Sequence, residues 1–170
     1  MLKVECDLKD VFEVTYSKLG SEGLLLASIG LDGKYNAMTI GWGLIGRVWG
    51  NPIFMVAVRP TRYTHRLIEE INEFTVNVPC DGMEEIVDYF GTVSGRDYDK
   101  FKEVGLTAER GKRVKSPIIS ECIAHYECRV LGKSKFIPDL LSSEVKRRYY
   151  LSENYHTLYF GRILSTIMEQ

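Results

Sequence analysis

The chain has 170 residues, of which 45% are hydrophobic and 26% charged, a balance typical of one globular domain that needs no metal or disulfide to hold its core. Its 22 basic and 23 acidic side chains nearly cancel, which excludes the strongly basic composition of a dedicated nucleic-acid binder. No apolar stretch reaches membrane-span length, and no signal-peptide pattern opens the chain. We therefore expect one cytoplasmic domain over residues 1–170, with neither a membrane nor a nucleic acid as partner.

The cysteines show no metal-binding spacing. They are Cys6, Cys80, Cys122 and Cys128, with no C-x-x-C pair among them, so no metal site is predicted. We interpret them as small buried side chains in a reducing compartment, with Cys122 and Cys128 on one face of a strand. A disulfide or a thiol-redox role is the alternative interpretation.

The first part of the chain predicts a hairpin. Residues 11–18 alternate loosely and indicate an extended entry segment, and residues 23–29 form an apolar run of strand length. Asp32 and Gly33 follow as a strong hairpin signal, so the returning strand is predicted over residues 35–43. The glycines near the end of that strand predict a bulge or a close approach of other backbone.

The middle of the chain alternates strands with helices. Residues 53–58 are predicted to form a buried strand. Residues 64–71 place three apolar side chains on one helical stripe, with Thr64 as the N-cap. Residues 73–78 alternate in the manner of a further strand.

A second helix is predicted over residues 83–90, capped by Asp81, and is followed by a polar loop over residues 91–105. The longest extended segment covers residues 118–131. Its two predicted faces differ in polarity. Ala124, Tyr126, Cys128 and Val130 lie on the more apolar face, and His125, Glu127 and Arg129 lie on the polar face.

The end of the chain predicts a helix that begins at Ser142 or Ser143 and ends near Leu151, followed by a closing strand over residues 155–168. Many short strands with few helices favour a mainly β fold with an antiparallel barrel over a parallel sheet.

Two chemically distinct ends flank the strand at residues 53–58. The later end concentrates Arg59, Arg62, Tyr63 and Thr64 where a strand gives way to a helix, and guanidinium groups with a helix N-terminus suit a phosphate. A capped turn with two solvated arginines explains the same residues and is the commoner outcome by composition alone.

The earlier end mixes small, amide, hydroxyl and aromatic side chains. Such groups are able to hydrogen-bond the edge of a heteroaromatic ring and to pack on its face, with Trp49 as a further aromatic candidate. A glycine-bulged strand with core tryptophans is the competing interpretation. The residues are Asn36, Ala37, Met38, Thr39, Ile40, Gly41 and Trp42.

The three histidines are separate cases. His65, in the first turn of its helix, and His125, opposite the apolar strand face, are predicted to be surface or interface residues. His156 enters the last strand, where it is placed to face a pocket as a hydrogen-bond donor or proton source. No nucleophile elbow, Walker motif, zinc motif or dinucleotide fingerprint is present.

Taken together, four motifs in order resemble the flavin reductase-like family of FMN-binding split barrels. They cover most of residues 12–168, and each is weak alone. They are Asn36 to Thr39 followed by Trp42; Arg62 to Thr64 leading into residues 73–78; Ser94 to Asp97 with Asp99, Lys100 and Phe101; and the closing segment from His156 to Arg162.

This resemblance implies a six-stranded antiparallel Greek-key barrel that pairs as a homodimer and holds FMN non-covalently near the dimer interface. It implies that Arg62, Tyr63 and Thr64 bind the phosphate, with Arg59 and Lys100 as weaker candidates. The loop over residues 36–42 would wrap the isoalloxazine and ribityl chain. His156 is the candidate catalytic residue, on the nicotinamide side.

The implied activity is an oxidoreductase in which hydride passes from NADH or NADPH to flavin N5, and then to free flavin, a ferric chelate or a redox protein partner. Two alternatives stay open. One is an FMN-binding electron carrier, reduced by a partner protein without NAD(P)H activity of its own. The other is a barrel of the same fold that binds haem or another cofactor.

Overall fold

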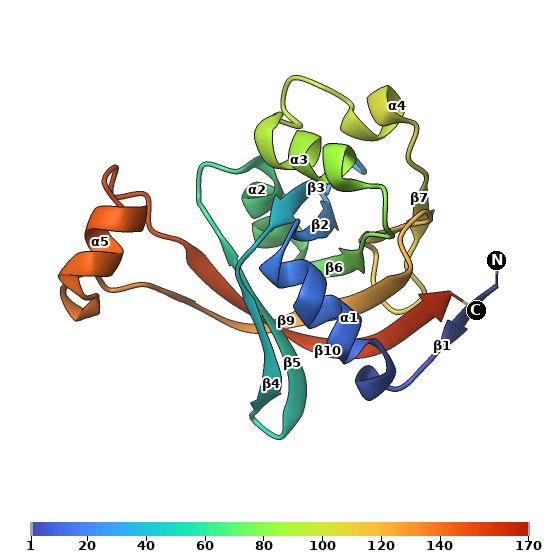
Figure 1. Ribbon diagram of the computed structural model, residues 1–170, viewed down its shortest axis with the longest axis horizontal. Helices are drawn as coiled ribbons and strands as arrows, with labels where there is room; N and C mark the ends of the chain where they lie inside the picture. Colours follow the sequence, from blue (N-terminus) through green and yellow to red (C-terminus); the bar gives the residue numbers. More distant parts are fainter. Residues whose placement is uncertain (1, 170) are drawn as a thin grey trace.

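The computed structural model describes residues 2–169, and its main feature is one antiparallel sheet of eight strands (Figure 1). Seven of them follow the order β3-β2-β6-β9-β10-β5-β4, and β1 pairs with the far end of β10. The strands are β1 (Lys3–Glu5), β2 (Leu24–Ile29), β3 (Tyr35–Ile40), β4 (Gly43–Val48), β5 (Asn51–Val58), β6 (Glu73–Val78), β9 (Ala124–Lys135) and β10 (Thr157–Glu169).

Shorter elements cover this sheet and join its strands. Two strands, β7 (Ala108–Arg110) and β8 (Pro117–Ile119), pair separately. The helices are α1 (Leu8–Gly20), α2 (Tyr63–Ile71), α3 (Glu84–Thr92), α4 (Lys100–Val104) and α5 (Ser143–Tyr149), with a 3-10 turn η1 (Pro138–Leu140) before α5.

All six predicted strands are present, which confirms the mainly β antiparallel fold. They are β2, β3, β5, β6, β9 and β10. The sheet curls until β3 approaches β5 without pairing to it, so the barrel is split at this seam. The main core fills the barrel with side chains such as Phe54, Phe74 and Tyr126, all fully buried.

A second core lies outside the barrel, between the outer face of β2 and β3 and the helices α3 and α4. Phe90 and Phe101 meet edge to face there, with ring centroids 5.5 Å apart. Because neighbouring residues of a strand point to opposite faces, β3 serves both cores: Met38 and Ile40 face the barrel while Ala37 faces α3.

The entry segment at residues 11–18 was predicted to be extended, and this prediction is wrong. It lies inside helix α1, whose buried Val11 packs in the main core with Leu8 and Leu19 beside it. These side chains recur at helical spacing, and their packing in the main core, not the loose alternation, decides the structure of the segment. Thr15 fixes the helix to the barrel, since its hydroxyl lies 2.6 Å from the hydroxyl of Tyr126.

The returning strand predicted at residues 35–43 is in fact divided. β3 ends at Ile40, and β4 begins at Gly43 to form a projecting hairpin with β5 (Figure 1). Gly43 makes the close approach that its sequence position predicted: a Cβ there would lie 3.0 Å from the Met55 carbonyl oxygen. The apolar segment at residues 44–49 is therefore a strand and turn.

Two predicted helix caps are wrong. The N-cap of α2 is Arg62, and Thr64 is instead a buried residue inside the first turn. Helix α3 begins after Met83, and the carboxylate of Asp81 does not cap it but pairs with Lys18 at 2.7 Å. By contrast, Ser142 caps α5 as predicted, accepting a hydrogen bond from the amide of Val145.

Two expectations for the second half of the chain change, and a third is confirmed. The loop at residues 91–105 contains α4, and the extended segment begins only at Ala124, with β8 separate from it. The alternation along β9 is confirmed for Ala124, Tyr126, Cys128 and Val130, which pack in or against the main core.

His125 was predicted at the surface or at an interface, but it is fully buried within the chain under β8, and its Nδ1 lies 2.9 Å from Asn77 Oδ1. His65 is only partly exposed. Cys122 lies in the second core, not beside Cys128.

Candidate functional site

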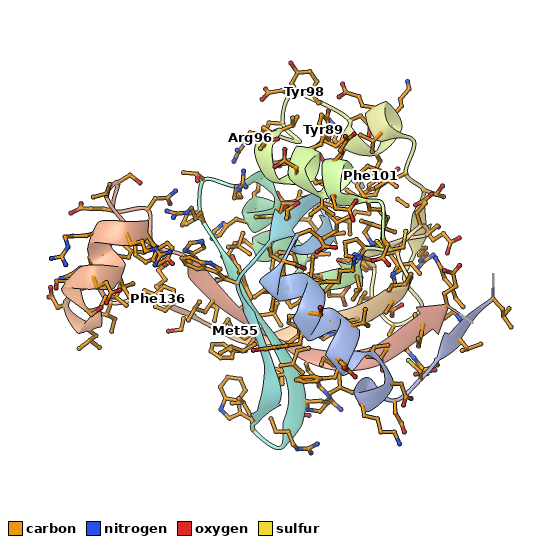
Figure 2. The ribbon with its side chains drawn as sticks, viewed as in Figure 1. Met55, Tyr89, Arg96, Tyr98, Phe101 and Phe136 are labelled. Carbon is orange, nitrogen blue, oxygen red and sulfur yellow. The ribbon has the colours of Figure 1, made fainter. Side chains whose placement is uncertain are left out.

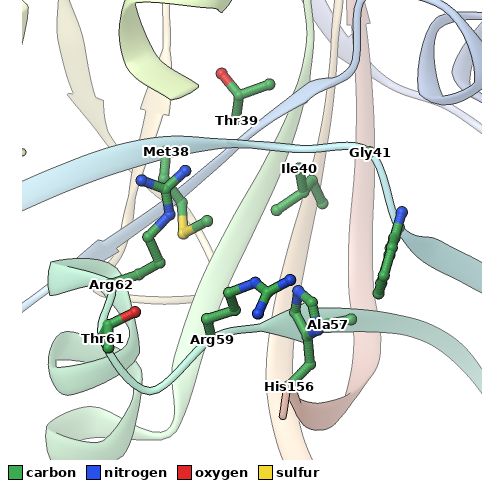
Figure 3. A pocket seen from close by; sticks show the side chains of 10 residues that line it. Met38, Thr39, Ile40, Gly41, Ala57, Arg59, Thr61, Arg62 and His156 are labelled. Carbon is green, nitrogen blue, oxygen red and sulfur yellow. The ribbon is translucent and has the colours of Figure 1, made fainter. Parts of the chain in front are cut away.

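Two neighbouring cavities open along the seam where β3 approaches β5 and α2, and Figure 3 shows the first of them. The first has a volume of about 360 Å³ and the second about 190 Å³. Met38, Thr61 and Arg62 line both, so the two form one groove. The two segments that the sequence marked, residues 36–42 and 59–64, supply more than half of the residues that line it.

The structure brings twelve of the thirteen predicted site residues to this groove. Ala37 is the exception, since it is buried in the second core. The first cavity takes Met38, Thr39, Ile40, Gly41, Trp42, Arg59, Arg62 and His156. The second takes Asn36, Met38, Arg62, Tyr63, Thr64 and Lys100. Trp49 lies elsewhere, at the β4–β5 turn against Phe160.

The second cavity gathers positive charge without a matching negative charge. Arg62 donates from Nη2 to the Gly91 carbonyl at 2.5 Å, and Lys100 donates from Nζ to the carbonyls of Phe90 and Val93, each at 3.1 Å. Within residues 2–169, neither cation forms an ion pair with a carboxylate. The first turn of α2 adds backbone N–H groups and the positive end of its dipole.

Burial, and after it the neighbouring positive charges, shifts the pKa values of these cations. Burial, then the nearby Arg62 charge, lowers the pKa of Lys100 to about 8. Burial, then Arg59, lowers the pKa of Arg62. A site that holds unpaired buried cations at this cost is stabilised by an anion, which would reverse both shifts.

A tight polar contact closes the inner wall of the second cavity. Asn36, at the start of β3, donates from Nδ2 to the Thr64 hydroxyl at 2.9 Å. Gly95 lies against this amide, and a Cβ at that position would fall 2.1 Å from Asn36 Oδ1. The glycine therefore lets the loop over residues 93–96 close on the strand.

Arg59 points toward the arm formed by η1, α5 and their flanking loops. Its Nη1 donates to the Asn154 carbonyl and its Nη2 to the Tyr149 carbonyl, each at 2.8 Å. The guanidinium also lies over the Tyr150 ring, 5.4 Å from the centroid. It therefore anchors the arm beside the first cavity, at the end away from Lys100.

Aromatic side chains line the other end of the groove. The rings of Trp42 and His156 lie 4.5 Å apart, and Tyr149 meets Trp42 edge to face at 5.0 Å. Burial, then Arg59 and Arg62, lowers the pKa of His156 to about 4. The imidazole is therefore neutral near pH 7, suited to donate a hydrogen bond but not to act as a proton source.

Sequence reasoning missed several lining residues. Thr61 sits inside the marked segment at residues 59–64, and Ser94, Gly95 and Arg96 belong to a motif that the sequence analysis had noted. Figure 2 shows Arg96 on the loop after α3, where its Nη1 donates to the Thr61 carbonyl at 2.8 Å. Arg96 reaches the groove only because this loop packs against β3.

Residues 2–169 offer neither a metal site nor a membrane-spanning helix. No three His, Cys, Asp or Glu side chains are grouped so as to hold a metal ion. None of the described helices combines the length and the apolar character needed to cross a membrane.

The fold defines an antiparallel split-barrel protein, and known structures agree. A flavoredoxin from Methanosarcina acetivorans superposes with a TM-score of 0.69 at 28% identity, over 87% of this chain and 69% of that one. The flavoredoxin of Desulfovibrio vulgaris (Miyazaki F) gives a TM-score of 0.70 at 24% identity, with the same coverage.

The chain belongs to the flavin reductase-like family, because the family model described as "flavin reductase like domain" matches residues 16–169. A curated relative, an uncharacterized protein of Archaeoglobus fulgidus, is 34% identical over 77% of this chain. The chain spans 64% of the length of that relative.

Proposed function

We propose that the groove binds FMN non-covalently, with the phosphate in the second cavity and the ring system in the first. The observation that carries this proposal is the set of cations without carboxylate partners, Arg62 and Lys100, at the N-terminus of α2. A phosphate supplies the negative charge that these groups lack. Membership of the flavin reductase-like family supports the choice of a flavin.

The residues of the groove fit a flavin in chemistry as well as in charge. Tyr63 and Thr64 add hydroxyl and backbone donors beside the proposed phosphate. Met38, Ile40 and Trp42 present an apolar and aromatic wall in the first cavity, which Thr39 and Gly41 also line. Ala37 supports this wall from behind, in the second core.

We propose an oxidoreductase activity in which NADH or NADPH supplies the electrons. When bound, a flavin would supply hydride acceptance and onward electron transfer, and the residues of the groove would position the reactants and exclude water. His156 donates a hydrogen bond in the first cavity, and Trp42 packs beside it. The acceptor is free flavin, a ferric chelate or a redox protein.

The test is the absorbance spectrum of purified protein supplied with FMN. We expect one FMN per chain and bleaching of the flavin band on addition of NADH or NADPH. Protein that retains no FMN contradicts the binding site. Protein that binds FMN but is not bleached by either nicotinamide contradicts the reductase activity alone.

An electron carrier is the second candidate, favoured by the likeness to the Methanosarcina acetivorans flavoredoxin at 28% identity. In this case FMN is bound in the same groove and is reduced only by a partner protein. Slow bleaching by NAD(P)H with fast bleaching through an added reductase would support the carrier over the reductase.

We propose that two copies of the chain associate as a homodimer. Large apolar side chains are exposed on the two parts that project from the barrel, the β4–β5 hairpin and the arm around α5 (Figure 1). Leu44 and Trp49 are 67% and 62% exposed on the first, and Leu140 and Leu151 are 78% and 85% exposed on the second.

All four cysteines are free thiols, which suits the cytoplasm as the proposed location.

A further inference from the structure

Tyr150 follows the last residue of α5 and reaches back to the first cavity. Only 3% of its surface is exposed. Its hydroxyl lies 2.8 Å from Nδ1 of His156. The arm therefore contributes a side chain that contacts the proposed catalytic residue directly, although Tyr150 is not a member of any sequence motif.

The surroundings fix which group donates in this hydrogen bond. Burial raises the pKa of the Tyr150 phenol, so the hydroxyl keeps its proton. The backbone N–H of His156 approaches the phenol oxygen as a donor, and among residues 2–169 the only acceptor within reach of the hydroxyl is Nδ1 of His156. A buried O–H that donated to nothing would lose a hydrogen bond, so the phenol donates and Nδ1 of His156 accepts.

Acceptance at Nδ1 determines the tautomer of a neutral imidazole. The ring proton must then lie on Nε2. His156 is largely buried and lines the first cavity, and Nε2 forms no hydrogen bond with the described protein groups. The charged groups nearest to the ring are Arg59 and Arg62, which oppose a second proton.

Several contacts hold Tyr150 in this position. Tyr155 stacks on its ring at 4.6 Å, with 25° between the planes. Arg59 lies over the same ring and binds the carbonyls of Tyr149 and Asn154 on either side. Trp42 meets the ring edge to face at 6.3 Å. The hydroxyl is thus held by packing at the end of the arm.

We propose that Tyr150 is a positioning residue that fixes His156 as a neutral donor with its proton on Nε2, so that the first cavity selects ligands with an acceptor oxygen, such as a carboxamide carbonyl. The selection of an electron donor rests on the proposed function, whereas the tautomer does not. A nicotinamide carries such a carbonyl beside its reactive carbon.

The direct test is the ¹⁵N NMR spectrum of the histidine rings in the full chain without nicotinamide. His125 is an internal reference, because its Nδ1 must donate to the Asn77 Oδ1 acceptor, which already accepts from the Ile119 amide. We expect His156 to show the opposite tautomer. A His156 protonated on Nδ1 overturns the proposal.

Two variants distinguish the effect of the Tyr150 hydroxyl from the effect of the stacked rings. Y150F keeps the ring and removes the O–H, and Y155F makes the same change on the stacked neighbour, whose hydroxyl forms no hydrogen bond among the described residues. We expect Y150F to release a share of His156 to the Nδ1–H tautomer and Y155F to leave the spectrum unchanged. Equal shifts in both variants, or none in Y150F, overturn the proposal.

A kinetic measurement tests the consequence for selection. In Y150F we expect the dissociation constant for FMN to stay within about twofold, while the rate of flavin reduction by NAD(P)H falls about five- to tenfold, as for loss of one oriented hydrogen bond. An unchanged rate overturns the positioning role. Failure to bind FMN at all would refute the proposed function while the NMR result still decides the tautomer.

Discussion

Arg62 lines both cavities and is the side chain on which the proposed phosphate position most depends. We expect R62A to weaken FMN binding about tenfold to a hundredfold, because a charge-assisted hydrogen bond contributes about 1.5–3 kcal/mol. R66A is a matched control, since Arg66 lies on the same helix and pairs with Glu70 outside the groove. Isothermal titration measures both, and equal losses in the two variants would contradict the assignment.

Lys100 predicts a pH dependence of FMN binding. Its pKa of about 8 lies below the ordinary 10.5, so in the free protein it loses its charge as pH rises through 8. Phosphate binding favours the charged form, so FMN affinity should fall above pH 8, by at most about tenfold per unit. The unfolded chain binds more protons between pH 8 and 10.5, so this group alone raises the stability of the free protein over that range.

Fluorescence titrations from pH 7 to 10 test the Lys100 prediction. Riboflavin, which lacks the phosphate, should bind without this pH dependence. K100M should bind FMN more weakly at pH 7 and lose the dependence that Lys100 causes. A pH profile for FMN that K100M leaves intact would refute the role of this lysine.

At the scale of elements, the loop over residues 93–96 couples α3 to β3 through the contact of Gly95 with Asn36. G95A would force the Asn36 amide to move and would weaken its 2.9 Å bond to Thr64. We expect a lower melting temperature, with about 1–3 kcal/mol lost from the free energy of unfolding, together with weaker FMN binding.

Gly46 provides the control for this substitution, because a Cβ at that strand position meets nothing within 4 Å. G46A should leave the melting temperature and the FMN affinity near their original values. If G95A is equally neutral in thermal denaturation and in FMN titration, the loop does not depend on that contact.

At the scale of the whole molecule, the proposed homodimer predicts a sedimentation mass twice that of the chain. L44D places a charge on the exposed β4–β5 hairpin and should shift the equilibrium toward monomer. L31D is the control, because Leu31 is 79% exposed but lies at the β2–β3 turn. A monomeric wild-type chain, or equal effects of the two substitutions, would contradict the proposed interface.

The sequence predicted the fold where local signals were strong and unopposed. Asp32 and Gly33 marked the β2–β3 hairpin, and the alternation along β9 named the residues of the core face. It failed where tertiary packing decided the outcome. Helix α1 depends on Val11 docking into the barrel. Asp81 forms an ion pair with Lys18 and does not cap α3.

The residues of the site were likewise predicted where their own chemistry marked them and missed where tertiary contacts decided their role. Residues 36–42 and 59–64 were marked by their chemistry, and the seam between β3 and β5 brings them together. Tyr150 carried no comparable signal, and Gly95 carried only its place in the motif from Ser94 to Asp97, because their roles arise from contacts with His156 and Asn36 that only the folded chain creates. Arg59 was a candidate for the phosphate site, but its guanidinium hydrogen-bonds to backbone carbonyls of the arm.

A crystal structure of the protein grown with excess FMN tests the central claim most directly. We predict the phosphate within hydrogen-bond distance of Arg62 and the first turn of α2, and the ring system in the cavity lined by Trp42 and His156. A groove left without FMN, or FMN bound at another surface, would contradict the account.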